Sequence, residues 1–225
     1  AFEILFLPAR DGLEHELHLA TVGGRELVEH VQRIGTALKQ RGLGGIFLFA
    51  GEAGKIHGRG GVIADARAAY ALCRPPGHHA MRDCANGFCF FNNACIAANH
   101  LTRKFRKVAL IDVDVHTGNG SLDILYERGD IFFCSLHPDP GTFPTFYLGH
   151  PDETGAGEGR NRSLNILLEH GAGEAEVLAA LDRGLSAIRD FGAEALVVSL
   201  GFDMAADDPL AAVAVYPGGF AEMAR

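Results

Sequence analysis

The stretch VALIDVDVHTGNG, residues 108–120, joins an apolar run to a cluster of polar side chains. The run of β-branched and aliphatic residues, bounded by a lysine and a glycine, predicts a buried central strand of a parallel sheet. Asp112, Asp114 and His116 follow at a spacing of two, so an extended chain would line them along one edge. Ligands of open α/β sheets bind at the carboxyl ends of strands, and we expect a site here. The alternative is an ordinary strand end with solvated polar groups.

Strands and helices alternate along the rest of the chain. The patterns predict strands at 2–7, 69–73, 131–136, 163–168 and 195–200, and helices at 26–40, 121–126 and 174–191. Ser121 is the expected N-cap of the second helix, and residues 2–7 suit an edge strand or the strand by which the chain enters the sheet. Residues 45–50 suit either a strand or a buried helical turn. The alternation predicts an α/β fold: one domain, a mostly parallel sheet and helices on both faces.

Composition sets the class of protein. With 225 residues, 48% hydrophobic and 21% charged, the chain can bury one substantial core. A net charge of −8 argues against a nucleic-acid-binding surface and favours a cationic small substrate or basic peptide. No apolar run approaches the ~20 residues of a membrane span, and the amino terminus does not resemble a signal peptide. We therefore expect a cytoplasmic protein with no membrane partner.

The cysteines, at positions 73, 84, 89, 95 and 134, are odd in number and form no C-x-x-C pair. This pattern fits neither a disulfide framework nor a cysteine zinc finger. We expect mostly reduced, buried thiols. A reactive thiol at Cys89 is the minor alternative.

A second polar cluster follows the predicted strand at 69–73. The sequence RPPGHH, residues 74–79, places two adjacent histidines on a turn that two prolines and a glycine make stiff. Neighbouring imidazoles with different partners can hold different protonation states, which suits general acid and general base work. Next come Phe88, Phe90 and Phe91, which either wall a narrow channel or, as burial statistics favour, belong to the core.

The last predicted strand, 195–200, ends at Gly201-Phe202-Asp203. In a parallel sheet Asp203 lies at the same edge as Asp114 and His116 and can supply a third metal ligand. Two carboxylates and one imidazole suit zinc and leave a coordination position open, the arrangement of a catalytic rather than a structural site.

Five motifs occur in one order: RPPGHHA, GFCFFNN, the D-x-D-x-H strand end, SLHPDPGTFP and the final G-F-D. Together they resemble the zinc-dependent histone deacetylase superfamily, with its arginase/deacetylase-like fold. The motif sequences are most similar to those of the bacterial acetylpolyamine amidohydrolases and the class II-like deacetylases. The resemblance covers about residues 69–220.

The resemblance implies roles for individual residues. It implies a zinc site whose ligands are Asp114, His116 and Asp203. It implies a catalytic group of tandem histidines with a partner behind each: His78 with Asp112, and His79 with Asn119.

The resemblance also implies two neighbouring features. One is an acyl-lysine-like channel lined by Gly87, Phe88 and Phe143. The other is a buried monovalent-cation site, for K⁺, formed by the backbone around Asp112, Asp114 and His116 together with Ser135 and Leu136.

Three departures from the family pattern stand out. Thr117 occupies a position where many relatives have a second histidine. The chain ends at Arg225, before the Gly-Gly-Tyr motif that carries the family's catalytic tyrosine, and residues 1–60 do not align with confidence. We therefore expect residues 1–225 to form a deacetylase-like domain that is incomplete at its carboxyl end and short at its amino end.

The expected activity is zinc-dependent hydrolysis of N-acetylated amines, either an acetylpolyamine or an acetylated lysine side chain. A homodimer is the expected assembly by resemblance. Two alternatives stay open: an acyl-amine-binding module without catalysis on the same fold, and an arginase-like ureohydrolase with two metals.

Overall fold

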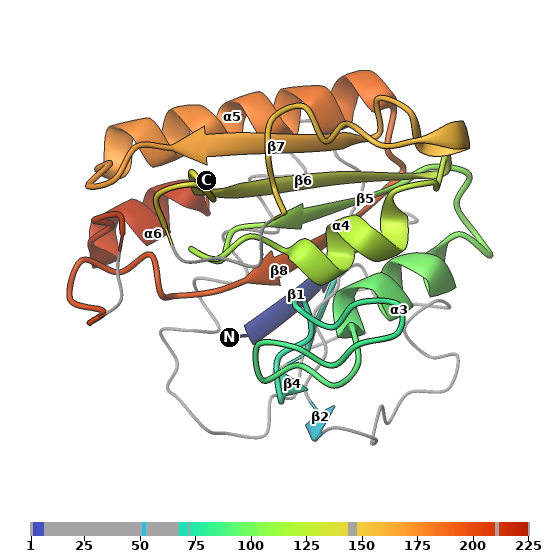
Figure 1. Cartoon of the computed structure of the whole chain (residues 1–225), viewed down its shortest axis with the longest axis horizontal. Coiled ribbons are helices and arrows are strands. Elements are labelled where there is room, and N and C mark those ends of the chain that lie inside the picture. Colours follow the sequence, from blue (N-terminus) through green and yellow to red (C-terminus); the bar gives the residue numbers. More distant parts are fainter. Residues whose placement is uncertain are drawn as a thin grey trace, which may run out of the picture.

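The computed structural model describes residues 2–6, 51–52, 68–71, 73–143, 148–209 and 212–224. The helix predicted at 26–40 and the segment at 45–50 lie outside these ranges. Figure 1 shows the chain as a central twisted sheet flanked by helices.

Six strands form the main sheet in the order β3-β1-β8-β5-β6-β7. Their bounds are β1 Phe2–Phe6, β3 Ala68–Ala71, β5 Val108–Asp112, β6 Ile131–Pro138, β7 Ser163–Leu168 and β8 Ala195–Leu200. Strands β5 to β8 run parallel to one another, whereas β1 is antiparallel to both of its neighbours. The predicted mostly parallel α/β sheet is confirmed.

Two strand predictions were wrong in detail. For residues 2–7 the edge-strand alternative is wrong, because β1 lies between β3 and β8, whereas the alternative of a strand by which the chain enters the sheet agrees with β1. The single strand expected at 69–73 is instead β3 and a separate short strand, β4 (Cys73–Arg74), which pairs with β2 (Gly51–Glu52). The chain therefore leaves the main sheet just before the Pro-Pro-Gly turn.

Strand β5 occupies the centre of the sheet, between β8 and β6, and all five of its residues are buried. Its side chains alternate between the two faces. A Cβ at Gly184, in helix α5 (Glu174–Phe191), would lie 3.3 Å from Ile111 Cδ1, whereas a Cβ at Gly118 would lie 2.4 Å from Asp112 Oδ2. The strand thus presents Ile111 to one layer of helix and Asp112 to the other.

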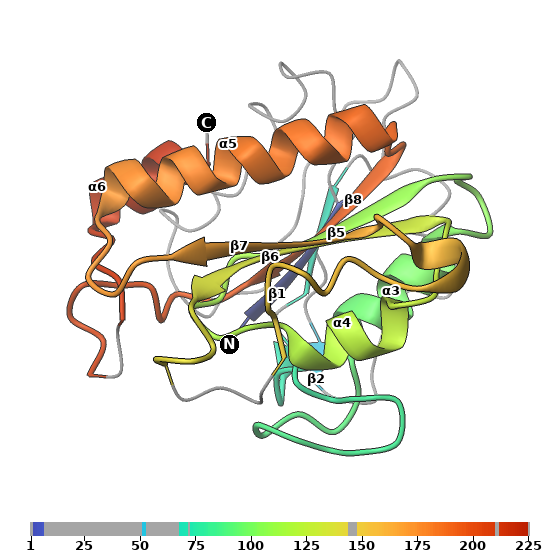
Figure 2. The same cartoon turned by 45° about the horizontal axis from the view of Figure 1, so that its top comes forward.

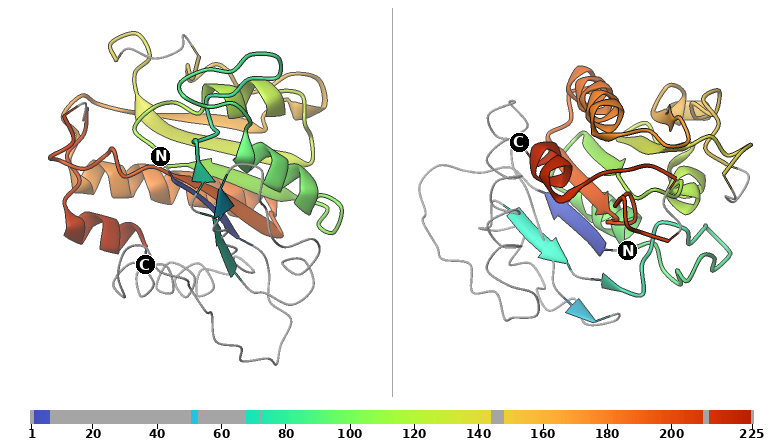
Figure 3. Two further views of the ribbon diagram at one scale, coloured as in Figure 1. Left: turned by 90° about the horizontal axis from the view of Figure 1, so that it is seen from below. Right: turned by 90° about the vertical axis from the view of Figure 1, so that its left-hand side faces the viewer.

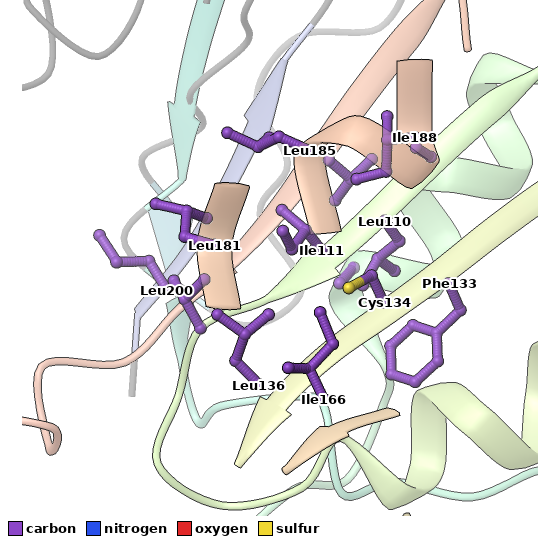
Figure 4. Close-up of a cluster of buried hydrophobic side chains, with 14 of the residues drawn as sticks. Leu110, Ile111, Phe133, Cys134, Leu136, Ile166, Leu181, Leu185, Ile188 and Leu200 are labelled. Atoms are coloured by element: carbon purple, nitrogen blue, oxygen red, sulfur yellow. The ribbon is translucent and has the colours of Figure 1, made fainter. Parts of the chain in front are cut away.

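Helix α5 (Glu174–Phe191) covers one face, and the short helix α6 (Pro217–Met223) lies beside it (Figures 2 and 3). The buried residues of α5 recur at spacings of three and four: Val177, Ala180, Leu181, Gly184, Leu185, Ile188 and Phe191. The Glu176 carboxylate accepts the Gly173 N–H at its start, and Gly192 ends it in the left-handed conformation with φ 78°. Figure 4 shows Leu181, Leu185 and Ile188 above the strands, where they form a dry core.

Helices α3 (Asn93–Leu101) and α4 (Asn119–Leu125) cover the opposite face (Figure 3, right, shows α4 there). The prediction of Ser121 as an N-cap was wrong, because α4 begins two residues earlier with Gly118 at the N-cap. The N–H groups of Gly120 and Ser121 instead donate to the carbonyl of His78, at 2.9 and 3.1 Å. A neighbouring loop, and not a side-chain cap, satisfies the first turn of this helix.

The aromatic residues after Gly87 also depart from expectation. Phe88, Phe90 and Phe91 are exposed, at 89%, 68% and 71%, so the core interpretation was wrong for them. Cys89 between them is buried, as are Cys95 and Cys134, whereas Cys84 is exposed. Within the described ranges, no helix has both the length and the apolar character needed to cross a membrane.

Candidate metal centre and paired histidines

The polar cluster forms where the chain leaves β5. Strand β5 ends at Asp112, so the extended path that we expected through His116 is wrong. Beyond the strand the carboxylates turn the backbone: Asp112 Oδ1 accepts the Asp114 N–H at 3.1 Å, and Asp114 Oδ1 accepts the His116 N–H at 2.9 Å. These turns of Asx type bring the side chains together in a loop.

Asp203 joins this loop from the end of β8. His116 Nδ1 lies 3.0 Å from Asp114 Oδ1 and 2.9 Å from Asp203 Oδ2. The other oxygen of Asp203 accepts the Val115 N–H at 3.0 Å, which ties the two strand ends together. One ligand atom from each of the three side chains lies within 4.8 Å of the others. The predicted ligand set is therefore assembled in space, although it comes from two strands.

The electrostatics of the cluster follow from burial and mutual contact. Burial opposes charge on His116, but its hydrogen bonds to Asp114 and Asp203 raise its pKa to about 9. Burial also opposes charge on Asp114, yet the nearby His78 and the bond from His116 hold the pKa of Asp114 below its usual range. Burial raises the pKa of Asp203, and the adjacent charge of Asp114 acts in the same direction. The two carboxylates favour a proton or a cation between them.

The residues present fit a divalent metal ion. Carboxylates and imidazole are ligand types that zinc accepts, and three protein ligands leave a coordination position open, as catalytic zinc sites do. Gly201 supplies the space: a Cβ there would lie 2.2 Å from Asp114 Oδ2 and 2.6 Å from Asp203 Oδ1. Any other residue at 201 would displace the carboxylates, so the backbone of this loop is built around them.

The tandem histidines pack beside this cluster, and each has its own partner. His79 Nδ1 donates to Asn119 Oδ1 at 2.6 Å, so that its lone pair is on Nε2. Burial, reinforced by the adjacent His78, lowers the pKa of His79 to about 3, which makes the ring neutral near pH 7. The His79 ring centroid lies 5.9 Å from that of His116.

His78 is placed against carboxylates. Its Nδ1 lies 3.0 Å from Asp112 Oδ2, and its Nε2 lies 3.9 Å from Asp114 Oδ2. Burial raises the pKa of Asp112, and the neighbouring His78 counteracts that rise. The predicted pairs, His78 with Asp112 and His79 with Asn119, are both formed. The two histidines therefore differ in partner: one faces a buried carboxyl group and the other a neutral amide.

The three residues expected to line a channel differ in how they lie relative to the histidines. A Cβ at Gly87 would lie 2.2 Å from His79 Cδ2, so this glycine, with φ 50°, lets the backbone contact the ring. Phe143 is buried, and its ring centroid lies 5.5 Å from that of His116. Phe88, with φ 65°, projects from the surface. Gly87 and Phe143 thus contact the site, whereas Phe88, the residue after Gly87, is exposed.

A buried polar chain lies beneath the cluster. Ser135, opposite Asp112 in the β5–β6 register, has its Oγ 2.8 Å from His137 Nδ1 and 3.4 Å from the Gly118 N–H. His137 Nε2 donates to the Gly149 carbonyl at 2.9 Å, and burial lowers the pKa of His137 to about 4. Ser135 and Leu136 are both fully buried here.

A surface depression lies at the opposite, amino end of the parallel strands, lined by Arg106, Lys107, Arg128, Gly129, Asp130, Glu158 and Glu194. Its charges serve the structure. Arg128 pairs with Asp130 at 2.8 Å, and Glu194 accepts the backbone N–H groups of Arg106 and Lys107. The cluster at the carboxyl end is the one that the described residues build for a metal.

The fold and the cluster define a class: α/β proteins with a carboxylate–imidazole cluster beside paired histidines at the carboxyl edge of a parallel sheet. Within that class the chain belongs to the histone deacetylase domain family, which it matches over residues 18–225.

The relatives that it matches include acetylpolyamine amidohydrolases. That of Burkholderia pseudomallei is 48% identical over 158 residues, which cover 70% of this chain and 46% of the relative. That of Mycoplana ramosa is 47% identical over 159 residues, or 70% and 47% of the two chains. A histone deacetylase-like amidohydrolase of Pseudomonas aeruginosa is 42% identical over 165 residues, 72% of this chain and 43% of that one. The chain spans a little under half the length of these relatives.

Solved structures give the same relationship. The acetylpolyamine aminohydrolase from Burkholderia pseudomallei superposes with a TM-score of 0.66 at 48% identity, over 67% of this chain and 44% of that chain. A histone deacetylase homologue in complex with the compound SAHA gives a TM-score of 0.63 at 30% identity, over 68% and 42%. The fold and family predicted from the motifs are confirmed.

Sequence reasoning missed several residues that shape the site. Gly201 and Gly120 make close approaches that only the folded chain reveals. His137 stood in a predicted loop but lies at the end of β6 with its ring buried. Asn92 was noted only as part of the FFNN motif, and its buried contacts follow from tertiary packing.

Proposed function

We propose that this chain carries the metal and proton-transfer groups of a zinc-dependent amidohydrolase that removes acetyl groups from N-acetylated amines. One observation carries the proposal. A metal-type cluster, Asp114, His116 and Asp203, lies next to a neutral imidazole, His79, whose Nδ1 proton is fixed by Asn119. A Lewis acid and a positioned base at one point are what hydrolysis of an amide needs.

Asp114, His116 and Asp203 would hold the zinc ion. When bound, zinc supplies Lewis-acid chemistry, polarising the acetamide carbonyl and lowering the pKa of water towards ~7. Val115 and Gly201 support the site: the Val115 N–H orients Asp203, and Gly201 leaves room for both carboxylates. Such supporting contacts fix the direction in which ligands point.

His79 is the proposed general base. Because its Nδ1 donates to Asn119 Oδ1 at 2.6 Å, Nε2 carries the lone pair and can accept a proton from the attacking water. An amide partner leaves the ring neutral before the reaction, whereas a carboxylate would favour the imidazolium. Transfer of that proton onward to the leaving amine would complete hydrolysis to acetate and a free amine.

His78 is the proposed second proton-handling group. Its Nδ1 lies 3.0 Å from the fully buried Asp112 carboxylate, which can stabilise positive charge that develops on the ring. The ring centroids of His78 and His79 are 3.9 Å apart, so charge on one ring affects the other. The two histidines would thus differ in when they carry a proton.

Substrate recognition would use the surfaces beside the histidines. Gly87 and Phe143 form the walls that contact His79 and His116, and the exposed Phe88 would cover the acyl-amine stem. The net charge of −8 favours a cationic acetylated amine. The names of the acetylpolyamine amidohydrolases that the chain resembles point to an acetylpolyamine ahead of an acetylated lysine.

A monovalent cation is a second proposed cofactor. Asp112 pairs with Ser135 in the β5–β6 register, Ser135 and Leu136 are fully buried, and the loop that follows β5 carries Asp114 and His116. Carbonyl and hydroxyl oxygens of this kind suit K⁺. The cation would lie under the zinc cluster and hold its loop in place.

The experiment separates this proposal from its alternatives. The chain is stripped with a chelator, loaded with zinc, and assayed for acetate released from an acetylpolyamine and an acetyl-lysine peptide. Zinc-dependent release that His79→Ala abolishes at equal zinc content supports the proposal. Zinc binding with substrate binding but no release would favour an acyl-amine-binding module. A requirement for two metals and release of urea from a guanidino substrate would favour the ureohydrolase.

A further inference from the structure

Asn92 is a buried amide that connects three elements around the tandem histidines. It is only 4% exposed and stands at the N-cap of α3. Its Oδ1 accepts the Cys95 N–H at 2.9 Å, the ordinary bond of an N-cap. Its Nδ2 makes two further bonds, to the Ala80 carbonyl at 3.3 Å and to Ser121 Oγ at 3.1 Å. Capping explains the oxygen of this side chain but not the nitrogen.

The two acceptors of that nitrogen flank the His79–Asn119 pair. Ala80 is the residue after His79, and Ser121 follows Asn119 by two positions in the first turn of α4. Helices α3 and α4 lie side by side at this point (Figures 1 and 2). One amide group therefore spans the gap between the segment that carries the imidazole and the helix that carries its partner.

The start of α4 also packs closely against the segment that carries the histidines. A Cβ at Gly120 would lie 2.3 Å from the Ala80 oxygen, so the start of α4 rests directly on the histidine segment. The Gly120 and Ser121 N–H groups donate to the His78 carbonyl. These bonds hold His78, whereas Asn92 holds the backbone on the other side of His79.

We propose that Asn92 is a positioning residue for His79, holding the imidazole in register with Asn119 through its bonds to Ala80 and Ser121. The inference rests on the proposed role of His79 as base. Reacting groups must be held within about 0.5 Å of their productive positions, and bonds on both sides of the pair meet that need. Serine and aspartate cap helices as well as asparagine does, but neither can donate both bonds.

The test separates capping from positioning. Asn92→Ser keeps a neutral cap oxygen and removes the bridging N–H group. Asn99→Ser is the matched control, since Asn99 lies at the other end of α3 and accepts a bond from Arg128. Both variants are loaded with zinc in the full chain, and the His79 Nδ1 proton is followed by ¹H–¹⁵N NMR of labelled histidine.

We expect Asn92→Ser to speed exchange of the His79 Nδ1 proton by about tenfold or more and to move its resonance, with zinc content unchanged. Where turnover is measurable, kcat should fall about tenfold with KM within about twofold. Asn99→Ser should change none of these. An Nδ1 resonance and exchange rate equal to those of the parent in a folded Asn92→Ser protein would overturn the inference.

A second variant covers the case in which Asn92→Ser does not fold. Ser121→Ala removes one of the two acceptors and leaves the cap of α3 intact. It should accelerate the same proton exchange to a smaller extent, and an unchanged signal would count against the inference. Absence of turnover in every variant bears on the proposed function alone, because the NMR signature does not depend on catalysis.

Discussion

Both faces of the sheet are packed by buried apolar side chains, but they differ in their polar contacts. Under α5, side chains such as Ile111, Cys134 and Ile188 pack without polar partners, and the close approach of α5 at Gly184 is apolar. On the opposite face, Asp112 pairs with His78, and Ser135 Oγ accepts the N–H of Gly118 at the start of α4. Apolar contact is non-directional, whereas a hydrogen bond depends on distance and angle. Both faces therefore contribute stability, and the α4 face adds the directional contacts that fix the geometry of the site.

The largest effect should come from the metal-type cluster of Asp114, His116 and Asp203. Replacing Asp114, His116 or Asp203 by Ala should abolish stoichiometric zinc binding, because only three protein ligands are available in this cluster. Elemental analysis of each purified variant measures the zinc content. Full zinc occupancy in any one of the three would remove that residue from the ligand set.

His79→Ala should leave zinc bound but reduce kcat by roughly 10²–10⁴-fold, the usual contribution of a positioned base. The reason is that, among the described residues, His79 is the imidazole that bonds to Asn119, the partner that fixes its neutral tautomer. Steady-state kinetics on an acetylated amine, with zinc measured in parallel, make the comparison. An unchanged kcat at equal zinc content would assign the base to another residue.

On the apolar side, Ile188→Ala should lower the free energy of unfolding by about 2–5 kcal/mol, the cost of a cavity in a dry core. Ile188 is fully buried against the sheet. The exposed Ser186→Ala in the same helix is the control and should change stability by less than about 0.5 kcal/mol. Urea unfolding gives both values. Zinc affinity should be the same in the two folded variants, and a drop confined to Ile188→Ala would mean that the faces are coupled.

The smallest effect should separate two glycines at the second position of short helices. Gly120→Ala places a Cβ 2.3 Å from the Ala80 oxygen and should cost about 1–3 kcal/mol. Gly218→Ala in α6 meets nothing within 4 Å and should stabilise the chain by roughly 0.4–1 kcal/mol. Thermal unfolding compares the two. Equal shifts would show that the start of α4 can move away from the histidine segment.

Much of the fold was accessible from the sequence because its signals are local. The apolar run at 108–112 and the helical periodicity at 174–191 were both predicted correctly, since a buried strand and an amphipathic helix leave their period in the chain. The spacing of Asp112, Asp114 and His116 identified the site, although it misjudged the backbone path. Because these three side chains are close together in the sequence, they stay near one another whether the backbone is extended or turned.

The sequence by itself determined which residue types meet: two carboxylates, an imidazole and a histidine pair, each at the end of a strand. Only the tertiary structure decided how they meet. Asp203 reaches His116 across 87 positions, and Asn92 reaches Ser121 across 29. Phe88, Phe90 and Phe91 are exposed despite their apolar character. Periodicity reports which face of an element is buried, but contacts between distant segments depend on how the layers pack, and that is a property of the whole fold.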